Sequence, residues 1–173
     1  APNASPNLPW RPPVTHFRTR LSSSSPRDWR ALLALAPLLL VVGCVSVPLE
    51  TAQEDAKGKQ FTPPPSDKGS LYVYRRGPMG ATAAITVTIA GTLQTELAPD
   101  TWVWLQGAPA SIDVKCTGTD GGDALNVNVG PGDMRFVEVA FRPGLMGRRC
   151  AVLEAPAAQG RAAVLAGHRA VGP

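Results

Sequence analysis

The chain has 173 residues, which is enough for one domain of ordinary size. Its net charge of +4 suggests a basic protein, but the excess lies in the first 43 residues, which hold five arginines and one aspartate. The rest of the chain holds 12 basic and 12 acidic residues. Because this remainder is neutral overall, it has no electrostatic basis for binding nucleic acid, and we expect no nucleic-acid partner.

The N-terminal region has the organisation of a signal peptide. Residues 1–30 are rich in Pro, Ser and Arg, and an apolar run of twelve residues, Ala31–Val42, follows Arg27 and Arg30 closely. That length suits the apolar core of a signal peptide, whereas a membrane-spanning helix needs about 20 residues. We therefore expect residues 1–43 to form a leader and signal peptide.

The apolar run ends in Val41-Val42-Gly43-Cys44. This tetrapeptide resembles the lipobox of bacterial lipoproteins, in which the signal is cut before the cysteine. The resemblance implies cleavage between Gly43 and Cys44, a diacylglycerol on the Cys44 thiol, and acylation of the new amino group, as with palmitate. The alternative is an ordinary cleaved signal followed by a chance cysteine.

A lipidated Cys44 would make the membrane a partner of this protein, since two or more acyl chains anchor a protein stably. The next residue is Val45, whereas an Asp at this position commonly retains Gram-negative lipoproteins in the inner membrane. The resemblance therefore implies a lipid-anchored protein of the cell envelope. Its expected location is the inner leaflet of the outer membrane, facing the periplasm.

Residues 44–68 are expected to be the lipidated cysteine and a flexible tether. The segment combines charged residues with the run Pro63–Pro65. Sequence of this kind is solvated and semi-extended, with a reach of roughly 25–30 Å. A short helix over Leu49–Lys57 is an alternative, and we expect such a helix to bury little.

From residue 69 the hydrophobic pattern changes to period two. Ile85, Val87 and Ile89, for example, alternate with two threonines, which is typical of a strand with one buried face. Turn-forming sequences such as Ala90-Gly91 and Gly130–Asp133 separate the alternating segments. Eight strands are predicted: Gly69–Arg76, Ala84–Ile89, Thr92–Leu97, Thr101–Leu105, Ser111–Cys116, Leu125–Val129, Met134–Phe141 and Cys150–Leu153.

Many short strands with turns between them indicate an all-β sandwich or barrel rather than a sheet with helical crossovers. We favour a small antiparallel β-sandwich of about seven or eight strands over residues 69–155. Residues 156–173 are expected to be a C-terminal tail, in which Gln159–Arg169 can form a short helix.

Cys116 and Cys150 remain as a pair once Cys44 is assigned to the lipid. Both fall at predicted strand ends, and an even number of cysteines in an exported domain favours a disulfide. Such a bridge would close a loop of about 35 residues and stabilise the domain by roughly 4 kcal/mol in the chain-entropy model. Two buried free thiols are the alternative.

Four short stretches follow one another along the domain. They are Leu71-Tyr-Val-Tyr-Arg75 after the Pro-rich segment, the strand into Ala90-Gly91 with Leu97 following, Ser111–Val114, and Gly130–Phe136 before a strand. Together they resemble the uncharacterised bacterial lipoprotein family "domain of unknown function 2846" over about residues 68–155. The resemblance implies a β-sandwich in the cell envelope and no established activity.

The pattern does not indicate a catalytic site. Residues 69–155 contain no histidine, which hydrolases with a Ser or Cys nucleophile use as their base. Carboxylates are present, but their spacing singles out no pair: Glu96, Asp113, Asp120, Asp123, Asp133 and Glu138. We expect no enzymatic activity and no cofactor.

The acidic, Gly-rich loop Thr117–Asp123 has two interpretations. Its carboxylates, Asp120 and Asp123, could bind calcium, but two are few for an ion that takes six to eight oxygen ligands. A long hairpin turn is the simpler interpretation, and His16 and His168 lie outside the likely core, so we expect no metal. The pairs Arg75-Arg76 and Arg148-Arg149 are interpreted as solvated charges.

Tyr72, Tyr74, Trp102 and Trp104 alternate within two predicted strands. If their aliphatic neighbours face the core, the four rings form an exposed surface suited to a protein or a glycan. If the aromatic positions face the core instead, the four rings help to fill it. The domain has few other large side chains, which favours this interpretation. Both interpretations stay open.

These features together favour an outer-membrane-anchored lipoprotein whose periplasmic β-sandwich acts as a binding or scaffold module without catalysis. Its partner would be an envelope protein or a glycan. Two alternatives are a lipoprotein component of an envelope secretion machine, which rests on analogy between folds, and a lipoprotein that binds peptidoglycan or another glycan.

Overall fold

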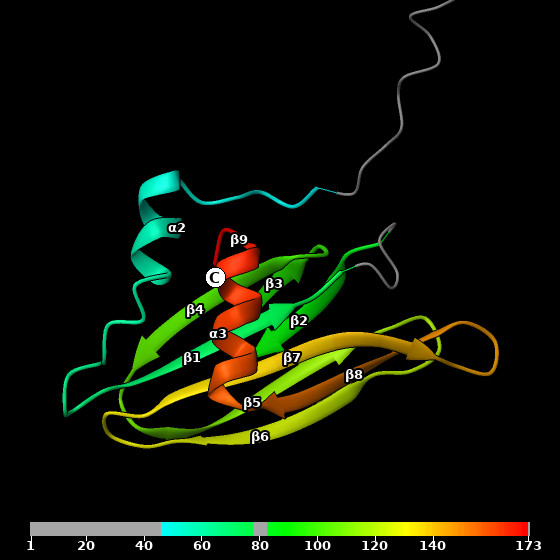
Figure 1. Cartoon of the computed structure of the whole chain (residues 1–173). Coiled ribbons are helices and arrows are strands. Elements are labelled where there is room, and N and C mark those ends of the chain that lie inside the picture. Colours follow the sequence, from blue (N-terminus) through cyan, green and yellow to red (C-terminus); the bar gives the residue numbers. More distant parts are fainter. Residues whose placement is uncertain (1–45, 78–82, 173) are drawn as a thin grey trace, which may run out of the picture. The chain divides into compact units, whose positions relative to one another are not determined.

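A computed structural model describes residues 46–77 and 83–172 of the chain, and these residues form two β-sheets packed face to face (Figure 1). The strand order is β8-β7-β1-β4-β9 in the first sheet and β3-β2-β5-β6 in the second. The predicted all-β sandwich is confirmed, and each of the eight predicted segments coincides with one strand from β1 to β8. The strands are β1 (Gly69–Arg75), β2 (Ile85–Ile89), β3 (Leu93–Leu97), β4 (Thr101–Gly107), β5 (Ala110–Thr117), β6 (Asp123–Val129), β7 (Met134–Pro143), β8 (Arg148–Ala155) and β9 (His168–Arg169).

The main core lies between the two sheets and is built from the alternating positions. Ile85, Val87 and Ile89 of β2 are completely buried, as the period-two pattern predicts. Leu71 and Val73 of β1 enter the same core from the opposite sheet. The aliphatic side chains of alternate residues therefore hold the sandwich together.

Two strand pairs of the first sheet are parallel, so the prediction of a purely antiparallel sandwich is wrong in this respect. Strand β1 pairs antiparallel with β4 and parallel with β7, and β4 pairs parallel with β9. Alternation along a strand identifies its buried faces but carries no information on the direction of its neighbours. As a central strand, β1 is buried at all seven residues.

The helix α3 (Ala157–Ala166) follows β8 and crosses the outer face of the first sheet (Figure 1). It lies close to the sheet at Gly160, where an added Cβ would collide with the ring of Phe136. The chain then returns to the sheet as β9, so the predicted tail contains a helix and also an unpredicted edge strand. Within residues 46–77 and 83–172, no helix is both long and apolar enough to cross a membrane.

Tyr72, Tyr74 and Trp102 are almost completely buried, so of the two interpretations left open for the aromatic residues the core one is confirmed for these three. With Phe136 they form a second core between the first sheet and α3, and Trp104 lies half-buried at its edge. The rings of Tyr72 and Trp104 stack with their centroids 5.9 Å apart. Because helices cover the outer face, the aliphatic and the aromatic residues of β1 both enter a core, one on each side of the strand.

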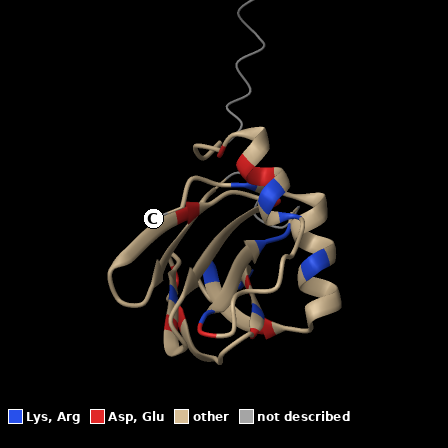
Figure 2. Cartoon of the chain, turned by 90° about the vertical axis from the view of Figure 1, so that its left-hand side faces the viewer, with Lys and Arg blue, Asp and Glu red and all other residues tan. Residues whose placement is uncertain are grey.

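Residues 46–68 pack on the domain, in contrast to the flexible tether that their composition predicts. They include the helix α2 (Ala52–Gly58), whose N-cap Thr51 accepts a hydrogen bond from the backbone N–H of Glu54 at 3.3 Å. Figure 2 shows acidic and basic positions next to one another on this helix, where they form ion pairs at helical spacing.

Contacts at its last residue and at its middle fix α2 to the sandwich. The hydroxyl group of Tyr72 donates to the carbonyl oxygen of Gly58 at 3.0 Å, and Gly58 lies so close to the indole of Trp102 that a Cβ would collide with it. The carboxylate of Asp55 accepts a hydrogen bond from the backbone N–H of Arg169 at 2.7 Å. The expectation that a helix here would bury little is confirmed, because Gly58 is the one residue of α2 that is buried.

Candidate functional site

The predicted cleavage and lipidation positions, Gly43 and Cys44, lie outside the described residues. The described chain begins nearby, and Val47 and Pro48 line a pocket of about 540 Å³ together with residues of β2, β3 and the C-terminal segment. One of these residues is Thr86, next to the first residue of β2. The chain therefore enters the domain beside the end of the sandwich at which β2 begins.

Cys116 and Cys150 form a disulfide, as predicted, with their Cα atoms 6.1 Å apart. Cys116 belongs to β5 of the second sheet and Cys150 to β8 of the first, and both side chains are buried. The bridge therefore ties the two sheets of the sandwich together near the turn between β7 and β8.

The carboxylates of the acidic loop bind backbone amides. One oxygen of Asp120 accepts from the N–H of Met146 at 3.1 Å. Asp123 accepts from Val152 at 3.1 Å and from Ala124 at 3.0 Å. Within the described residues, no group of three or more His, Cys, Asp or Glu side chains is arranged to hold a metal ion. The carboxylates of this loop thus fix the backbone of the turn between β7 and β8, at Met146, and of β8, at Val152.

The turn between β7 and β8 presents two large apolar side chains to solvent. Leu145 and Met146 are 101% and 95% exposed, and Gly144 donates its N–H to the carbonyl of Gly147 at 3.0 Å to close the turn. Figure 1 shows this hairpin extending beyond the neighbouring strands at one end of the sandwich. Adjacent apolar side chains held in solvent mark a candidate contact surface, and we call residues 142–149 the β7–β8 tip.

The loop between β5 and β6 braces this tip. The N–H of Asp120 donates to the carbonyl of Arg148 at 3.2 Å, and the hydroxyl of Thr119 accepts from the N–H of Arg148 at 3.5 Å. The carbonyl of Gly121 accepts from the N–H of Cys150 at 3.2 Å. Together with the disulfide, these bonds hold the backbone of the tip in one arrangement.

Three exposed arginines, Arg142, Arg148 and Arg149, flank the apolar pair. None of them takes part in the ion pairs found in the described part of the chain. Arg76, in contrast, is bound by the carboxylate of Glu138 at 2.8 Å. The tip therefore combines apolar side chains with positive charges that no described carboxylate neutralises.

Arg75 is buried beneath the tip, so its interpretation as a solvated charge is wrong. Its guanidinium donates to the carbonyl oxygens of Ala83 at 2.6 Å and Leu97 at 2.8 Å. The ring of Phe141 lies 5.0 Å from this guanidinium and 5.6 Å from that of Arg148. Burial lowers the pKa of Arg75, as does the positive charge of Arg148, but an arginine stays protonated in proteins.

A pocket of about 510 Å³ opens beside the base of the tip. Its lining is apolar with several hydroxyl groups and one guanidinium: Ala83, Ala84, Thr86, Thr117, Gly118, Thr119, Phe141, Gly147 and Arg148. Thr86 also lines the pocket beside Val47 and Pro48. The entry of the chain and the base of the tip therefore lie toward the same end of the sandwich, the entry beside β9 at one edge of the first sheet and the tip on β7 and β8 at the other edge.

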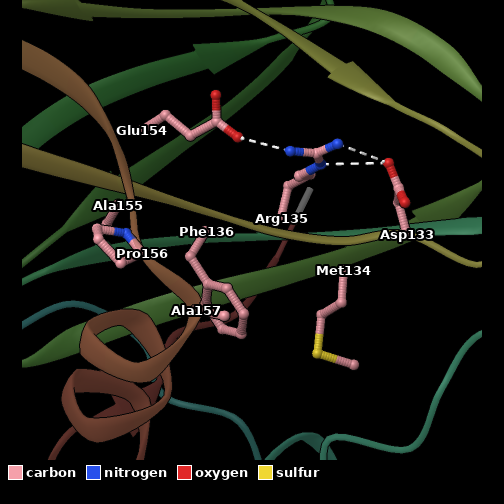
Figure 3. Close-up of a pocket in the computed structure, with 8 residues that line it drawn as sticks. All are labelled: Asp133, Met134, Arg135, Phe136, Glu154, Ala155, Pro156 and Ala157. Carbon is pink, nitrogen blue, oxygen red and sulfur yellow. Dashed lines mark hydrogen bonds and ion pairs between the residues drawn. The ribbon is translucent and has the colours of Figure 1, made fainter.

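A third pocket, of about 480 Å³, lies at the opposite end of β7 (Figure 3). Its guanidinium, that of Arg135, contacts Asp133 at 2.9 Å and Glu154 at 3.3 Å. The hydrogen bond to Asp133 raises the pKa of Arg135, and the same bond lowers the pKa of Asp133. Because two carboxylates already bind this arginine, the pocket is poorly suited to an anionic ligand.

The other acidic residues considered as catalytic candidates form ion pairs with basic side chains or are exposed to solvent. Asp113 pairs with Lys115 at 2.9 Å, and Asp133 and Glu138 bind the arginines described above. Glu96 is exposed on β3. These carboxylates face basic side chains or solvent, so the structure gives none of them the surroundings of a catalytic acid or base.

The two tyrosines considered as surface residues stay protonated at neutral pH. Burial raises the pKa of Tyr72 to about 12, although the charges of Arg169 and Arg161 oppose this change. Burial also raises the pKa of Tyr74 to about 12, and the nearby carboxylate of Glu138 adds to the effect. Both side chains are thus neutral members of the second core.

Comparisons with protein-family models, curated proteins and solved structures gave no match to the chain. The fold and the site define a disulfide-linked two-sheet sandwich that carries a braced, cationic tip with apolar residues at its end. Since a sandwich serves many functions, the function has to be argued from this site.

The sequence reasoning missed the β7–β8 tip. The signal was present, because Leu145 and Met146 stand between two glycines where a hairpin turn usually has polar residues. Arginines on both sides of the turn add a second signal. Apolar residues in a turn between two predicted strands therefore indicate a contact surface.

Proposed function

We propose that this protein is a lipid-anchored domain of the cell envelope and acts as a binding or scaffold module without catalysis. The lipobox-like sequence Val41–Cys44 supports the anchor. The disulfide between Cys116 and Cys150 supports a location in the cell envelope, because disulfides persist in oxidising compartments such as the periplasm. In this proposal Cys44 holds the domain on the inner leaflet of the outer membrane.

The observation that carries the binding role is the β7–β8 tip. A fully exposed apolar pair, Leu145 and Met146, is kept in one arrangement by hydrogen bonds from a neighbouring loop and by an adjacent disulfide. A rigid apolar tip loses little conformational freedom on binding, which favours a role in contact with a partner.

A component of an envelope secretion machine is a second candidate. The hairpin β7–β8 projects from one end of the sandwich and could reach into a membrane assembly (Figure 1). Glycan binding loses its main argument, because Tyr72, Tyr74 and Trp102 are buried and Trp104 is only partly exposed.

Mass spectrometry of the membrane fraction tests the anchor. Full-length protein produced in a Gram-negative host is expected to yield an N-terminal peptide that starts at Cys44 and carries three acyl chains. The variant Cys44→Ala is the matched control and should keep its signal and lose the lipid. An unmodified Cys44 on an intact or differently cut chain would overturn the proposed anchor.

Crosslinking in the native envelope tests the binding or scaffold role. Photoreactive residues at position 145, on fully exposed Leu145, and at position 153, on exposed Leu153 of β8, report partners of the tip and of the sheet edge away from it. A reproducible crosslink to one envelope protein supports the role. Discovery of a chemical reaction that depends on a described carboxylate would contradict it.

A further inference from the structure

We propose that the β7–β8 tip binds the anionic headgroup surface of the membrane that carries the lipid anchor. The contact would orient the domain on the bilayer, so that one end of the sandwich faces the lipid and the other faces the periplasm. The inference rests on the proposed function for the identity of that membrane. The contact itself depends only on the residues of the tip.

The apolar part of the contact is the pair at the end of the tip. The side chains of Leu145 and Met146 are fully exposed and adjacent, on the two central positions of a closed turn. Apolar side chains beside basic ones enter the boundary between headgroups and acyl chains, which is the usual mode of interfacial binding.

The charge of the tip complements an anionic lipid surface. Arg142, Arg148 and Arg149 flank the apolar pair without a carboxylate partner among the described residues. A guanidinium binds phosphate through two parallel N–H donors. The carboxylate of Asp120, which contacts the turn, accepts the N–H of Met146. The tip therefore carries a positive charge beside an apolar end, which favours an anionic lipid over a purely apolar partner.

The entry of the chain lies at the same end of the sandwich as the tip. Thr86 lines both the pocket beside Val47 and Pro48 and the pocket beside Arg148. One residue, Val45, separates Cys44 from the first described residue, Ser46, a span of at most about 7 Å. A lipid on Cys44 and the tip can therefore reach the same bilayer surface, where the acyl chains would hold the protein and the tip would fix its orientation.

Vesicle sedimentation tests this contact without the lipid anchor. The protein is the chain from residue 45 to residue 173 with its disulfide intact, since residues 43–173 form one compact unit. The probes are vesicles of phosphatidylglycerol, which is anionic, and of phosphatidylcholine, which is zwitterionic. We expect at least tenfold stronger binding to phosphatidylglycerol, and we expect that preference to fall as salt rises.

Two tip variants and two matched controls distinguish a specific contact of the tip from nonspecific adsorption of the protein to vesicles. Leu145→Ser/Met146→Ser should weaken binding to phosphatidylglycerol at least tenfold, and Arg142→Gln/Arg149→Gln should weaken it about 25-fold, because each basic residue contributes about fivefold. The controls are Leu165→Ser, at a half-exposed leucine of α3, and Lys68→Gln, at the opposite end of β1. Both should bind within twofold of the wild type.

Several results would overturn the proposal. They are equal binding to both kinds of vesicle, unchanged binding of the tip variants, or an equal loss in the controls. A photoreactive residue at position 145 that joins a protein, combined with no vesicle binding, would assign the tip to a protein partner instead. Because the sedimented chain lacks Cys44, an unlipidated Cys44 in cells would overturn the anchor and leave this result unaffected.

Discussion

The hydroxyl group of Tyr72 donates a hydrogen bond to the carbonyl oxygen of Gly58 at 3.0 Å, which joins the middle of a central strand to the end of helix α2. The bond is buried, and the indole of Trp102 packs against Gly58 beside it. The segment that leads from the proposed anchor to the sandwich is therefore part of the folded domain.

Removing this hydroxyl is expected to lower the stability of the domain. Tyr72→Phe keeps the ring in the second core but leaves the carbonyl of Gly58 without its buried donor, so the free energy of unfolding should fall by about 1–2 kcal/mol. Urea unfolding followed by circular dichroism measures the change. Lys57→Ala is the control, because its amine makes only an exposed ion pair at 3.6 Å and should cost under about 0.5 kcal/mol. Equal losses in the two variants would contradict this assignment.

Removing the disulfide is expected to destabilise the domain more strongly. Cys116 and Cys150 are separated by 34 positions in the chain, so the bridge restricts the unfolded state and contributes about 4 kcal/mol in the chain-entropy model. The double variant Cys116→Ala/Cys150→Ala should lose a comparable amount in urea unfolding. Reductant should destabilise the wild type toward the variant and leave the variant unchanged. If reductant left the free energy of unfolding of the wild type unchanged, the bridge would not form in the protein.

Stability should depend on pH through Asp55. Burial acts to raise the pKa of this carboxyl, but the bonds from Lys59 and from the N–H of Arg169, each 2.7 Å long, outweigh it, and the folded-state pKa is lowered from 3.8. A lowered pKa contributes stability above the unfolded value, and this stability is lost as pH falls through the folded value. Asp55→Asn should therefore cost about 1–2 kcal/mol at pH 7 and less at pH 3, which lies below the ordinary pKa of 3.8.

Urea unfolding at pH 7 and pH 3 measures this difference. Asp67→Asn, at an exposed position before β1, is the control and should behave like the wild type at both pH values. A cost of Asp55→Asn that stays the same at pH 3 would contradict the role of the charged carboxylate. It would indicate that the shape of the side chain matters and its charge does not.

The strands were predictable because each carries its own signal. In β2 the residues Ile85, Val87 and Ile89 face the core and the threonines between them do not, and this period depends only on the pleat of the strand. Turn residues mark the ends in the same local way. Ala90 and Gly91 both adopt positive φ, at 52° and 75°, in the turn after β2. Where the information is local, prediction and structure agree.

The burial of Tyr72 and Arg75 was not predictable, because it depends on what distant segments cover. Whether Tyr72 is a surface or a core residue is decided by α3, which comes some 85 residues later in the chain. Arg75 belongs to the alternating set that enters the main core, and its burial depends on the carbonyls of Ala83 and Leu97. A strand buried on both faces shows no single correct phase, so neither interpretation of its alternation is complete.

Asp120 offers the sharpest test of how the tip works, because its carboxylate has two opposing effects. It accepts the N–H of Met146 at 3.1 Å and so fixes the turn, while its negative charge opposes an anionic membrane. Asp120→Asn keeps an acceptor oxygen and removes the charge, so binding to phosphatidylglycerol vesicles should strengthen about fivefold. Asp120→Ala removes both, so amide hydrogen exchange at Met146 should accelerate and the gain in binding should be smaller, because a mobile tip loses more freedom on binding. Equal binding of the two variants would show that the hydrogen bond to Met146 contributes nothing to the contact. If Asp120→Asn bound more weakly than the wild type, the electrostatic attraction between the tip and the membrane would be contradicted.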